Sequence, residues 1–193
     1  VQKIDYLVVD HTEPDHAGSA AKISREEAMR LAADTLYKAL ETVNNPAGVR
    51  IGVETMGKLN QLGTIEEVIE LCKLGGTLSP VVDFGHVNCR ELGAAFKTKD
   101  DYRRVFDRIG ETLGDSYARD LHCHFSKIEY TDKGEKKHLT FKDDKFGPPY
   151  EPFAEAIAEY GLTPSIVCES DGTQAEDALA LKTLTEQFLG TNP

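Results

Sequence analysis

The chain has 193 residues, 40% of them hydrophobic and 28% charged, a balance typical of a folded domain with one core. The formal net charge of −11 argues against a broad basic surface for nucleic acid, although a local basic rim or bound metal cations can still attract phosphate. No apolar run approaches the roughly 18 residues that cross a bilayer, and no leader precedes the first expected strand, so we expect no membrane partner. The four cysteines form no C-x-x-C pair and indicate buried thiols in a reducing, cytoplasmic compartment.

Apolar runs typical of strands alternate with helical patterns along the whole chain. Capping boxes, in which a hydroxyl and a carboxylate satisfy free backbone N–H groups, open the first two helices, at Ser24 with Glu27 and at Thr64 with Glu67. In chain order we predict a strand at residues 4–9, a helix at 24–44, a strand at 49–55, a helix at 64–75, a strand at 80–84, a helix at 100–113, a strand at 121–126, a helix at 150–160, a strand at 165–169 and a helix at 173–189. The polar residues 127–149 are expected to be a solvated, mobile excursion.

This alternation predicts an α/β fold with right-handed β-α-β units and a parallel sheet. Such a sheet closes as a (β/α)8 barrel or stays open and doubly wound. No glycine-rich phosphate loop follows any strand, which weakens the open, nucleotide-binding alternative. We therefore predict a single barrel domain over residues 1–193. Because the chain begins with Val1 and shows fewer strands than a complete barrel, we expect its first N-terminal β/α units to be missing.

Polar side chains follow every predicted strand at its carboxyl end. The segments are His11-Thr12-Glu13-Pro14-Asp15-His16, Glu54-Thr55, Asp83-Phe84-Gly85-His86, His122-Cys123-His124 and Cys168-Glu169-Ser170. With His138, they contain all six histidines. In a parallel barrel these strand ends converge on one mouth, and imidazole with carboxylate suits zinc, manganese or iron. The pattern predicts a divalent metal site, because a buried carboxylate is costly without a compensating charge.

Simpler explanations exist for the individual residues. Any one of the strand-end histidines could do no more than bond a backbone carbonyl. Glu54 or Asp83 could cap the next helix or pair with Lys58 or Arg90. His122 and His124 lie two residues apart and point to the same face of a strand, so one could support the other instead of binding metal.

Five short segments, in this order and spacing, resemble the motifs of one family. They are His16-Ala17-Gly18-Ser19, Val53-Glu54-Thr55 with Gly57-Lys58, Asp83-Phe84-Gly85-His86, His122-Cys123-His124-Phe125-Ser126-Lys127 and Cys168-Glu169-Ser170. From Gly18 to its end, the chain resembles the xylose-isomerase-like TIM barrel superfamily. It resembles in particular the endonuclease IV branch, the family 2 apurinic/apyrimidinic (AP) endonucleases.

The resemblance implies a cluster of about two or three Zn²⁺ ions. The ligands it implies are His16, Glu54, Asp83, His86, His122, His138 and Glu169. The chain departs from the family's pattern in two places. An earlier histidine would lie on the missing strands, and the aspartate expected two residues before His138 is Lys136. Both departures threaten one metal position.

By this resemblance the chain is expected to be a zinc-dependent phosphodiesterase that cleaves DNA at abasic sites in base excision repair. Glu54 and Glu169 would be its catalytic carboxylates, flanking the metals and holding the attacking hydroxide. One alternative is a sugar isomerase or epimerase, in which Glu54, Asp83, His122 and Glu169 bind a single Mn²⁺ or Mg²⁺ and a carboxylate moves the proton. The acidic net charge favours a small sugar substrate. A third alternative is a metal-binding barrel without catalysis.

A second, local resemblance lies at the N-terminus. His11-Thr12-Glu13-Pro14-Asp15-His16 is similar to the H-x-E-x-D-H di-iron motif of flavodiiron proteins. Nothing downstream follows the pattern of that family. The segment adds Glu13 and Asp15 as candidate ligands.

Overall fold

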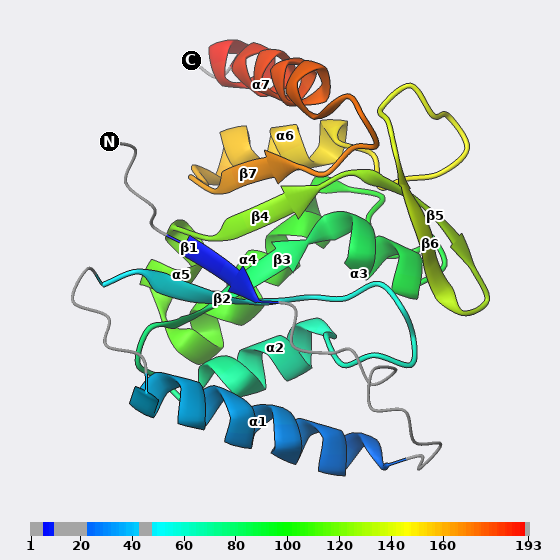
Figure 1. Ribbon diagram of the computed structural model, residues 1–193. Helices are drawn as coiled ribbons and strands as arrows, with labels where there is room; N and C mark the ends of the chain where they lie inside the picture. Colours follow the sequence, from blue (N-terminus) through cyan, green and yellow to red (C-terminus); the bar gives the residue numbers. More distant parts are fainter. Residues whose placement is uncertain (1–5, 10–22, 43–47, 192–193) are drawn as a thin grey trace.

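The strands of the computed structural model form one parallel sheet with a separate hairpin beside it (Figure 1). The structure describes residues 6–9, 23–42 and 48–191. The sheet has five strands in the order β1-β2-β3-β4-β7, and every neighbouring pair is parallel. Its strands are β1 (Tyr6–Val9), β2 (Arg50–Glu54), β3 (Leu78–Asp83), β4 (His122–Phe125) and β7 (Ser165–Cys168). The hairpin is formed by β5 (Lys127–Thr131) and β6 (Gly134–Leu139).

Helices connect the strands in the alternation that the sequence predicts. They are α1 (Arg25–Thr42), α2 (Ile65–Cys72), α3 (Phe84–Arg90), α4 (Lys99–Leu113), α5 (Asp115–Arg119), α6 (Glu151–Tyr160) and α7 (Gln174–Thr191). The Thr64–Glu67 capping box forms both of its bonds, and the Glu27 N–H donates to Ser24 Oγ at 3.1 Å. The predicted α/β class with its parallel sheet is therefore confirmed.

Two predictions of local structure were wrong. Residues 127–149 are not a featureless excursion, because they contain the hairpin, whose Ile128 is completely buried. The hairpin lacks the alternation of apolar and polar residues that would reveal it, since its strands are rich in Lys and Glu. The short helices α3, which directly follows β3, and α5 were also missed, because seven and five residues are too few to show a helical period.

The two faces of the sheet carry different residues. Val53, Val82, Cys123 and Phe125 pack with the helices in the hydrophobic core. The residues that alternate with them, including Glu54, Asp83 and His124, project from the other face, which in a barrel is the inside. Within the described residues β1 and β7 are the two edges of the sheet and do not pair, so these strands form an arc and not a closed ring.

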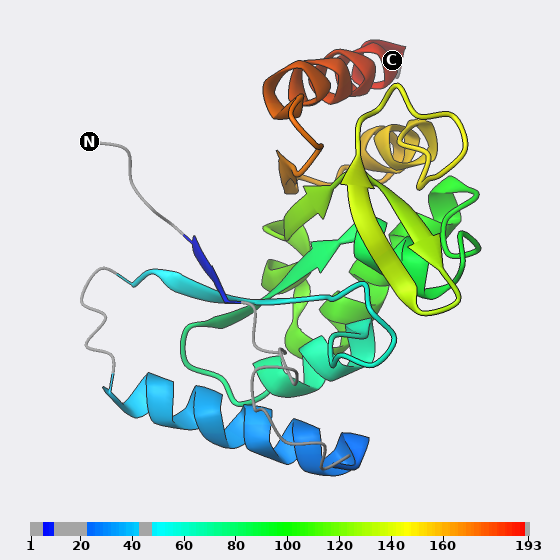
Figure 2. The ribbon, with the colours of Figure 1, turned by 45° about the vertical axis from the view of Figure 1, so that its right-hand side comes forward.

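The hairpin leans across the carboxyl end of this arc. Figure 2 shows it extending from β4 toward the loop that follows β2. The two segments are joined by an isolated bridge between Lys58 and Gly134 and by a bond from the Leu59 N–H to the Lys133 carbonyl at 3.1 Å. The hairpin therefore borders the strand ends that carry the polar residues.

All four cysteines are buried and have free thiols. Among the helices that the structure describes, none is long and apolar enough to span a membrane.

Candidate metal centre

Four side chains from four neighbouring strand ends converge on the inner face of the arc. This first donor group consists of Glu54, Asp83, His124 and Glu169, whose ligand atoms lie within 4.8 Å of one another. The Nδ1 atom of His124 lies 2.8 Å from Glu54 Oε1 and 3.2 Å from Glu169 Oε1. The parallel register sets this arrangement, since it pairs Asp83 with His124 across β3 and β4.

Asp83 has one oxygen committed to the fold and one that is not. Its Oδ1 caps α3 by accepting the His86 N–H at 2.8 Å. Its Oδ2 is buried and has no hydrogen-bond partner among the described residues. Arg90, a candidate partner from the sequence, donates instead to the carbonyls of Met56 and Lys58. A buried carboxylate oxygen without a partner is costly, and a bound cation would satisfy it.

The first donor group concentrates negative charge. Burial and the neighbouring charge of Asp83 raise the pKa of Glu169 to about 7. Burial disfavours the charged form of His124, yet the hydrogen bond and the charge of Glu54 raise the pKa of that imidazole to about 9. In the described part of the chain, the ion pairs of these three carboxylates are all with histidine. This surplus of negative charge fits a divalent cation.

A second donor group, His86, Glu135 and His138, joins α3 to the hairpin. Glu135 Oε2 lies 3.5 Å from His86 Nε2, and its Oε1 lies 3.7 Å from His138 Nε2. The Nδ1 atom of His86 lies 2.9 Å from the Thr55 carbonyl oxygen, and the Nδ1 atom of His138 lies 2.8 Å from Ser126 Oγ. Such bonds orient an imidazole so that its Nε2 is presented to a metal.

The two groups adjoin at His86. Its Nδ1 lies 3.6 Å from Asp83 Oδ2 and 3.8 Å from Glu54 Oε1. Burial lowers the pKa of His86, but the charges of Asp83, Glu135 and Glu54 outweigh it and raise the pKa. The centre therefore offers two neighbouring positions with nitrogen and oxygen donors, a set that suits zinc or manganese.

Most of the candidate ligands from the sequence come together in these groups. Glu54, Asp83 and Glu169 are in the first donor group, and His86 and His138 are in the second. The motif with His11, Glu13, Asp15 and His16 lies outside the described residues, so the structure does not place it.

Of the two histidines of β4, the structure brings together with the carboxylates the one that the sequence analysis did not select as a ligand. His122 belongs to neither donor group, and His124 takes its place. His122 pairs with Val81, two residues before the end of β3, whereas His124 pairs with Asp83 at the end of that strand. The rings of His122 and His124 lie 5.2 Å apart, and burial together with the charge of His124 lowers the pKa of His122.

Glu135 is the ligand candidate that sequence reasoning missed. The expected position held Lys136, whose Nζ lies 2.6 Å from Glu129 on the outside of the hairpin. The neighbouring Glu135 supplies the carboxylate instead. A glutamate in a segment rich in Lys and Glu gives no signal of its own, and only the proximity of His86 distinguishes it.

The parallel sheet carries a His/carboxylate centre at its carboxyl end, and comparison with known proteins gives the family. The chain belongs to the xylose isomerase-like TIM barrel family, whose model matches residues 2–186. It is 26% identical over 172 residues to an uncharacterized protein of Methanocaldococcus jannaschii, covering 89% of this chain and 62% of that protein.

A solved structure agrees with this fold. The crystal structure of AsfvAP:AG superposes with a TM-score of 0.58 at 15% identity, covering 93% of this chain and 61% of that one. At this identity the likeness concerns the fold alone. The chain spans about six tenths of the length of both of these proteins.

Proposed function

We propose that this chain carries the metal centre of a hydrolase of the endonuclease IV kind, a zinc-dependent phosphodiesterase that acts on DNA at abasic sites. The observation that supports this most directly is the second donor group, His86, Glu135 and His138, beside the first. Two adjoining cation positions are typical of enzymes that hydrolyse phosphodiesters. An isomerase with a single metal would leave the second group without a role.

The roles of the residues follow from their positions. Glu54 would contact the first position, since its Oε1 lies 2.8 Å from His124 Nδ1, and it lies 3.8 Å from Nδ1 of His86, whose Nε2 faces the second group. His124 and Glu169 would hold the first position, and His138 and Glu135 the second. When bound, divalent cations supply Lewis acidity toward water and a phosphoryl oxygen. Because the protein itself is strongly acidic, these cations would also be the local attraction for phosphate.

A sugar isomerase or epimerase is the second candidate, and two observations favour it. The first donor group alone is a complete set of three carboxylates and one imidazole. It would hold a single Mn²⁺ or Mg²⁺ that orients a ketose or aldose, while a carboxylate moves the proton. The net charge of −11 also suits a neutral sugar better than DNA.

Metal content separates these candidates. The purified protein would be stripped with a chelator, reloaded, and analysed by inductively coupled plasma mass spectrometry. The hydrolase predicts about two zinc ions per chain and nicking of a duplex with one abasic site. A single manganese or magnesium ion per chain, with turnover of a ketose, would contradict the hydrolase and support the isomerase. Absence of tightly held metal would contradict both.

Glu54→Gln tests the central carboxylate. We expect the nicking rate to fall about a hundredfold or more, because the variant removes a negative charge from the first donor group. Glu129→Gln is the matched control, since it changes a partly exposed carboxylate of the hairpin outside both groups. Thermal unfolding would verify that both variants fold, and substantial nicking by a folded Glu54→Gln protein would contradict the role.

A further inference from the structure

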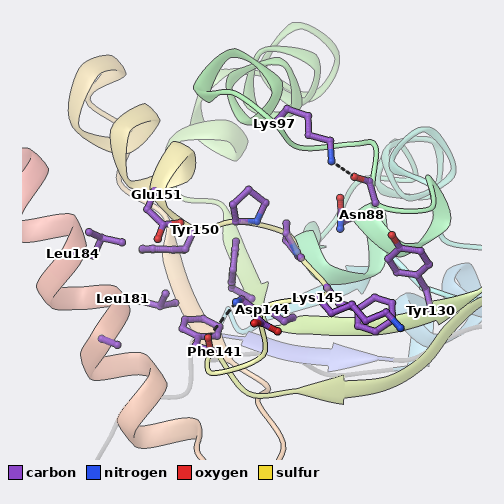
Figure 3. Close-up of a pocket in the computed structure, with 18 residues that line it drawn as sticks. Asn88, Lys97, Tyr130, Phe141, Asp144, Lys145, Tyr150, Glu151, Leu181 and Leu184 are labelled. Atoms are coloured by element: carbon purple, nitrogen blue, oxygen red, sulfur yellow. Dashed lines mark hydrogen bonds between the residues drawn. The ribbon is translucent and has the colours of Figure 1, made fainter.

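A cavity of about 470 Å³ is lined by residues of the hairpin, of the segment that follows it, and of α6 and α7. Figure 3 shows side chains from several elements around it, with Tyr130 and Lys145 on one side and Leu181 and Leu184 of α7 on the other. Among the described residues, none that lines the cavity belongs to either donor group. Its volume is that of a small-molecule site.

Aromatic rings form much of the lining. They are Phe125, Tyr130, Phe141, Phe146 and Tyr150. Tyr130 and Phe146 meet edge to face with their centroids 5.1 Å apart, and Phe125 and Tyr150 do so at 4.9 Å. Rings packed in this way stiffen the wall and leave aromatic faces for a flat ligand to stack on.

The lining carries a local positive charge in an acidic protein. Lys97, Lys127 and Lys145 line the cavity, against Asp144 and Glu151. Lys127 is committed to the fold, because its Nζ donates to the carbonyls of Phe141 and Asp143. Within the described residues neither Lys97 nor Lys145 forms an ion pair: Lys97 Nζ bonds the Gly93 carbonyl, and Lys145 Nζ lies 5.0 Å from the centroid of the Phe146 ring. The ammonium group of Lys145 remains available to an anion.

Asn88 gives an independent indication of a ligand. Its side chain lines the cavity, is 2% exposed, and has an Oδ1 atom with no hydrogen-bond partner among the described residues. A buried acceptor without a donor costs about 1–3 kcal/mol. A ligand that brings an N–H or O–H group would satisfy it.

We propose that this cavity binds a small molecule that combines a flat ring with an anionic group and has the size of a nucleoside monophosphate. The ring would stack on the aromatic wall, the anionic group would meet Lys145, and a ring or sugar donor would bond Asn88. The proposal concerns a site distinct from the metal centre and does not depend on which reaction that centre performs.

Isothermal titration calorimetry with adenosine 5′-monophosphate tests the proposal. We expect saturable binding with a Kd below about 1 mM, and binding about tenfold weaker or more for adenosine and for ribose 5-phosphate, which each lack one half of the ligand. Absence of saturable binding, or equal binding of ribose 5-phosphate, would overturn it.

Matched variants place the binding in the cavity. Ala180→Phe fills the cavity from the exposed surface of α7, and Ala178→Phe adds the same ring to that helix outside the cavity. Lys145→Gln removes a lining charge, and Lys142→Gln removes a nearby charge outside the lining. We expect the first of each pair to weaken binding about tenfold and the second to leave it unchanged.

Binding at the cavity must be distinguished from binding at the metal centre, because phosphate also binds metal ions. His138→Asn should leave binding of the monophosphate intact. Binding that is lost in His138→Asn and retained in Ala180→Phe belongs to the metal centre and overturns the proposal.

Discussion

Glu135 reaches the second donor group because of one unpaired residue in the hairpin. Glu129 lies opposite Lys137 and Tyr130 lies opposite Glu135, so the register passes over Lys136. In a regular strand, residues three apart face opposite sides. The bulge at Lys136 turns Glu135 to the side of His138, where it joins the second donor group.

Removing Glu135 should therefore empty one metal position. We expect Glu135→Ala to hold about one zinc ion fewer per chain than the unaltered protein, with the first donor group still loaded. Lys136→Ala is the control, since Lys136 contacts Glu129 and not the centre. Mass spectrometry of the reloaded proteins measures the stoichiometry, and an unchanged zinc content would assign Glu135 a purely structural role.

Glu67 makes stability depend on pH. Burial raises the pKa of this carboxyl, but hydrogen bonds from Arg25 and from the backbone of Thr64 and Gly63 outweigh burial and lower it to about 2 from an ordinary 4.5. A carboxyl whose pKa is depressed on folding stabilises the protein above its unfolded pKa and loses that contribution as pH falls toward the folded value. Its contribution is thus complete at pH 7 and fades between about pH 4.5 and 2.

Glu67→Gln should lower the free energy of unfolding by on the order of 1–2 kcal/mol at pH 7, a value discounted because Arg25 is partly exposed. The difference from the unaltered protein should shrink as pH falls toward 2. Urea unfolding at several pH values measures it, with the exposed Glu70→Gln as the control. A difference that stays constant with pH would exclude the charge as its cause.

At the scale of elements, the hairpin and the loop after β2 depend on two glycines for their contact. The Glu135 N–H donates to the Gly57 carbonyl at 3.1 Å. A Cβ atom on Gly57 would lie 2.6 Å from Glu135 Cβ, and one on Gly134 would lie 2.3 Å from the Gly57 oxygen. Gly134 also has a φ of 91°, which other residues rarely adopt. The close approach holds Glu135 against His86.

Gly57→Ala should thus act on the second metal position. The added methyl group displaces Glu135, so we expect loss of about one zinc ion per chain while the sheet and the first donor group persist. Gly190→Ala adds a methyl group where no atom lies within 4 Å and serves as the control. Zinc content and circular dichroism are the measurements, and full zinc loading of Gly57→Ala would show that the contact is dispensable.

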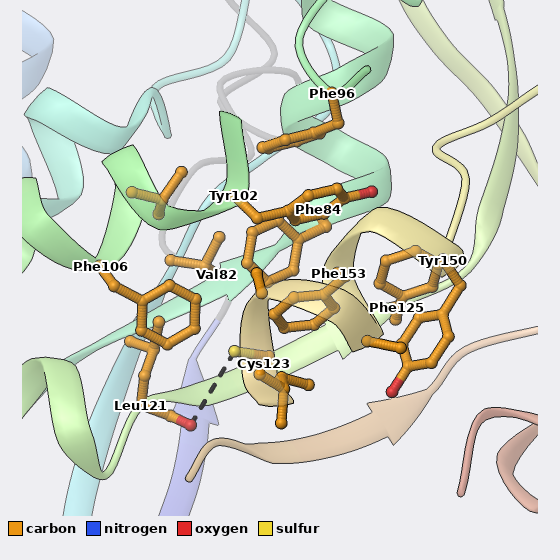
Figure 4. Close-up of a cluster of buried hydrophobic side chains, with 14 of the residues drawn as sticks. Val82, Phe84, Phe96, Tyr102, Phe106, Leu121, Cys123, Phe125, Tyr150 and Phe153 are labelled. Atoms are coloured by element: carbon orange, nitrogen blue, oxygen red, sulfur yellow. Dashed lines mark hydrogen bonds between the residues drawn. The ribbon is translucent and has the colours of Figure 1, made fainter. Parts of the chain in front are cut away.

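At the scale of the whole molecule, a cluster of aromatic rings joins the sheet to its helices. Phe153 of α6 lies in it, completely buried, with ring centroids at 4.6 Å from Phe84 and 4.9 Å from Tyr102 (Figure 4). It also packs with Phe125 of β4, whose neighbour His124 belongs to the metal centre. The cluster therefore supports both the fold and the strand that carries a ligand.

Phe153→Ala should lower the free energy of unfolding by about 3–5 kcal/mol, because it removes buried contacts and leaves a cavity. Leu179→Ala on the exposed surface of α7 should change it by about 0.5 kcal/mol or less. Chemical denaturation measures both. A loss below about 1 kcal/mol for Phe153→Ala would mean that the neighbouring rings close the space.

The pattern of residues predicted the alternation of the five sheet strands with their long helices, the parallel sheet, and the edge at which the polar residues collect. These features are local: capping boxes such as Thr64 with Glu67 and apolar runs act within a few residues. The carboxyl ends of parallel strands then share one edge whatever the packing, so Glu54, Asp83 and Glu169 could be placed together in advance.

Which side chains meet at that edge depends on long-range packing. His122 and His124 face the same side, and the register between β3 and β4, not the local pattern, brings His124 to Asp83. The bulge at Lys136 and the close approach of Gly57 bring Glu135 to the centre from a distant segment. Register, bulges and docking depend on contacts between residues far apart in the chain, and a periodic pattern within one segment carries no information about them.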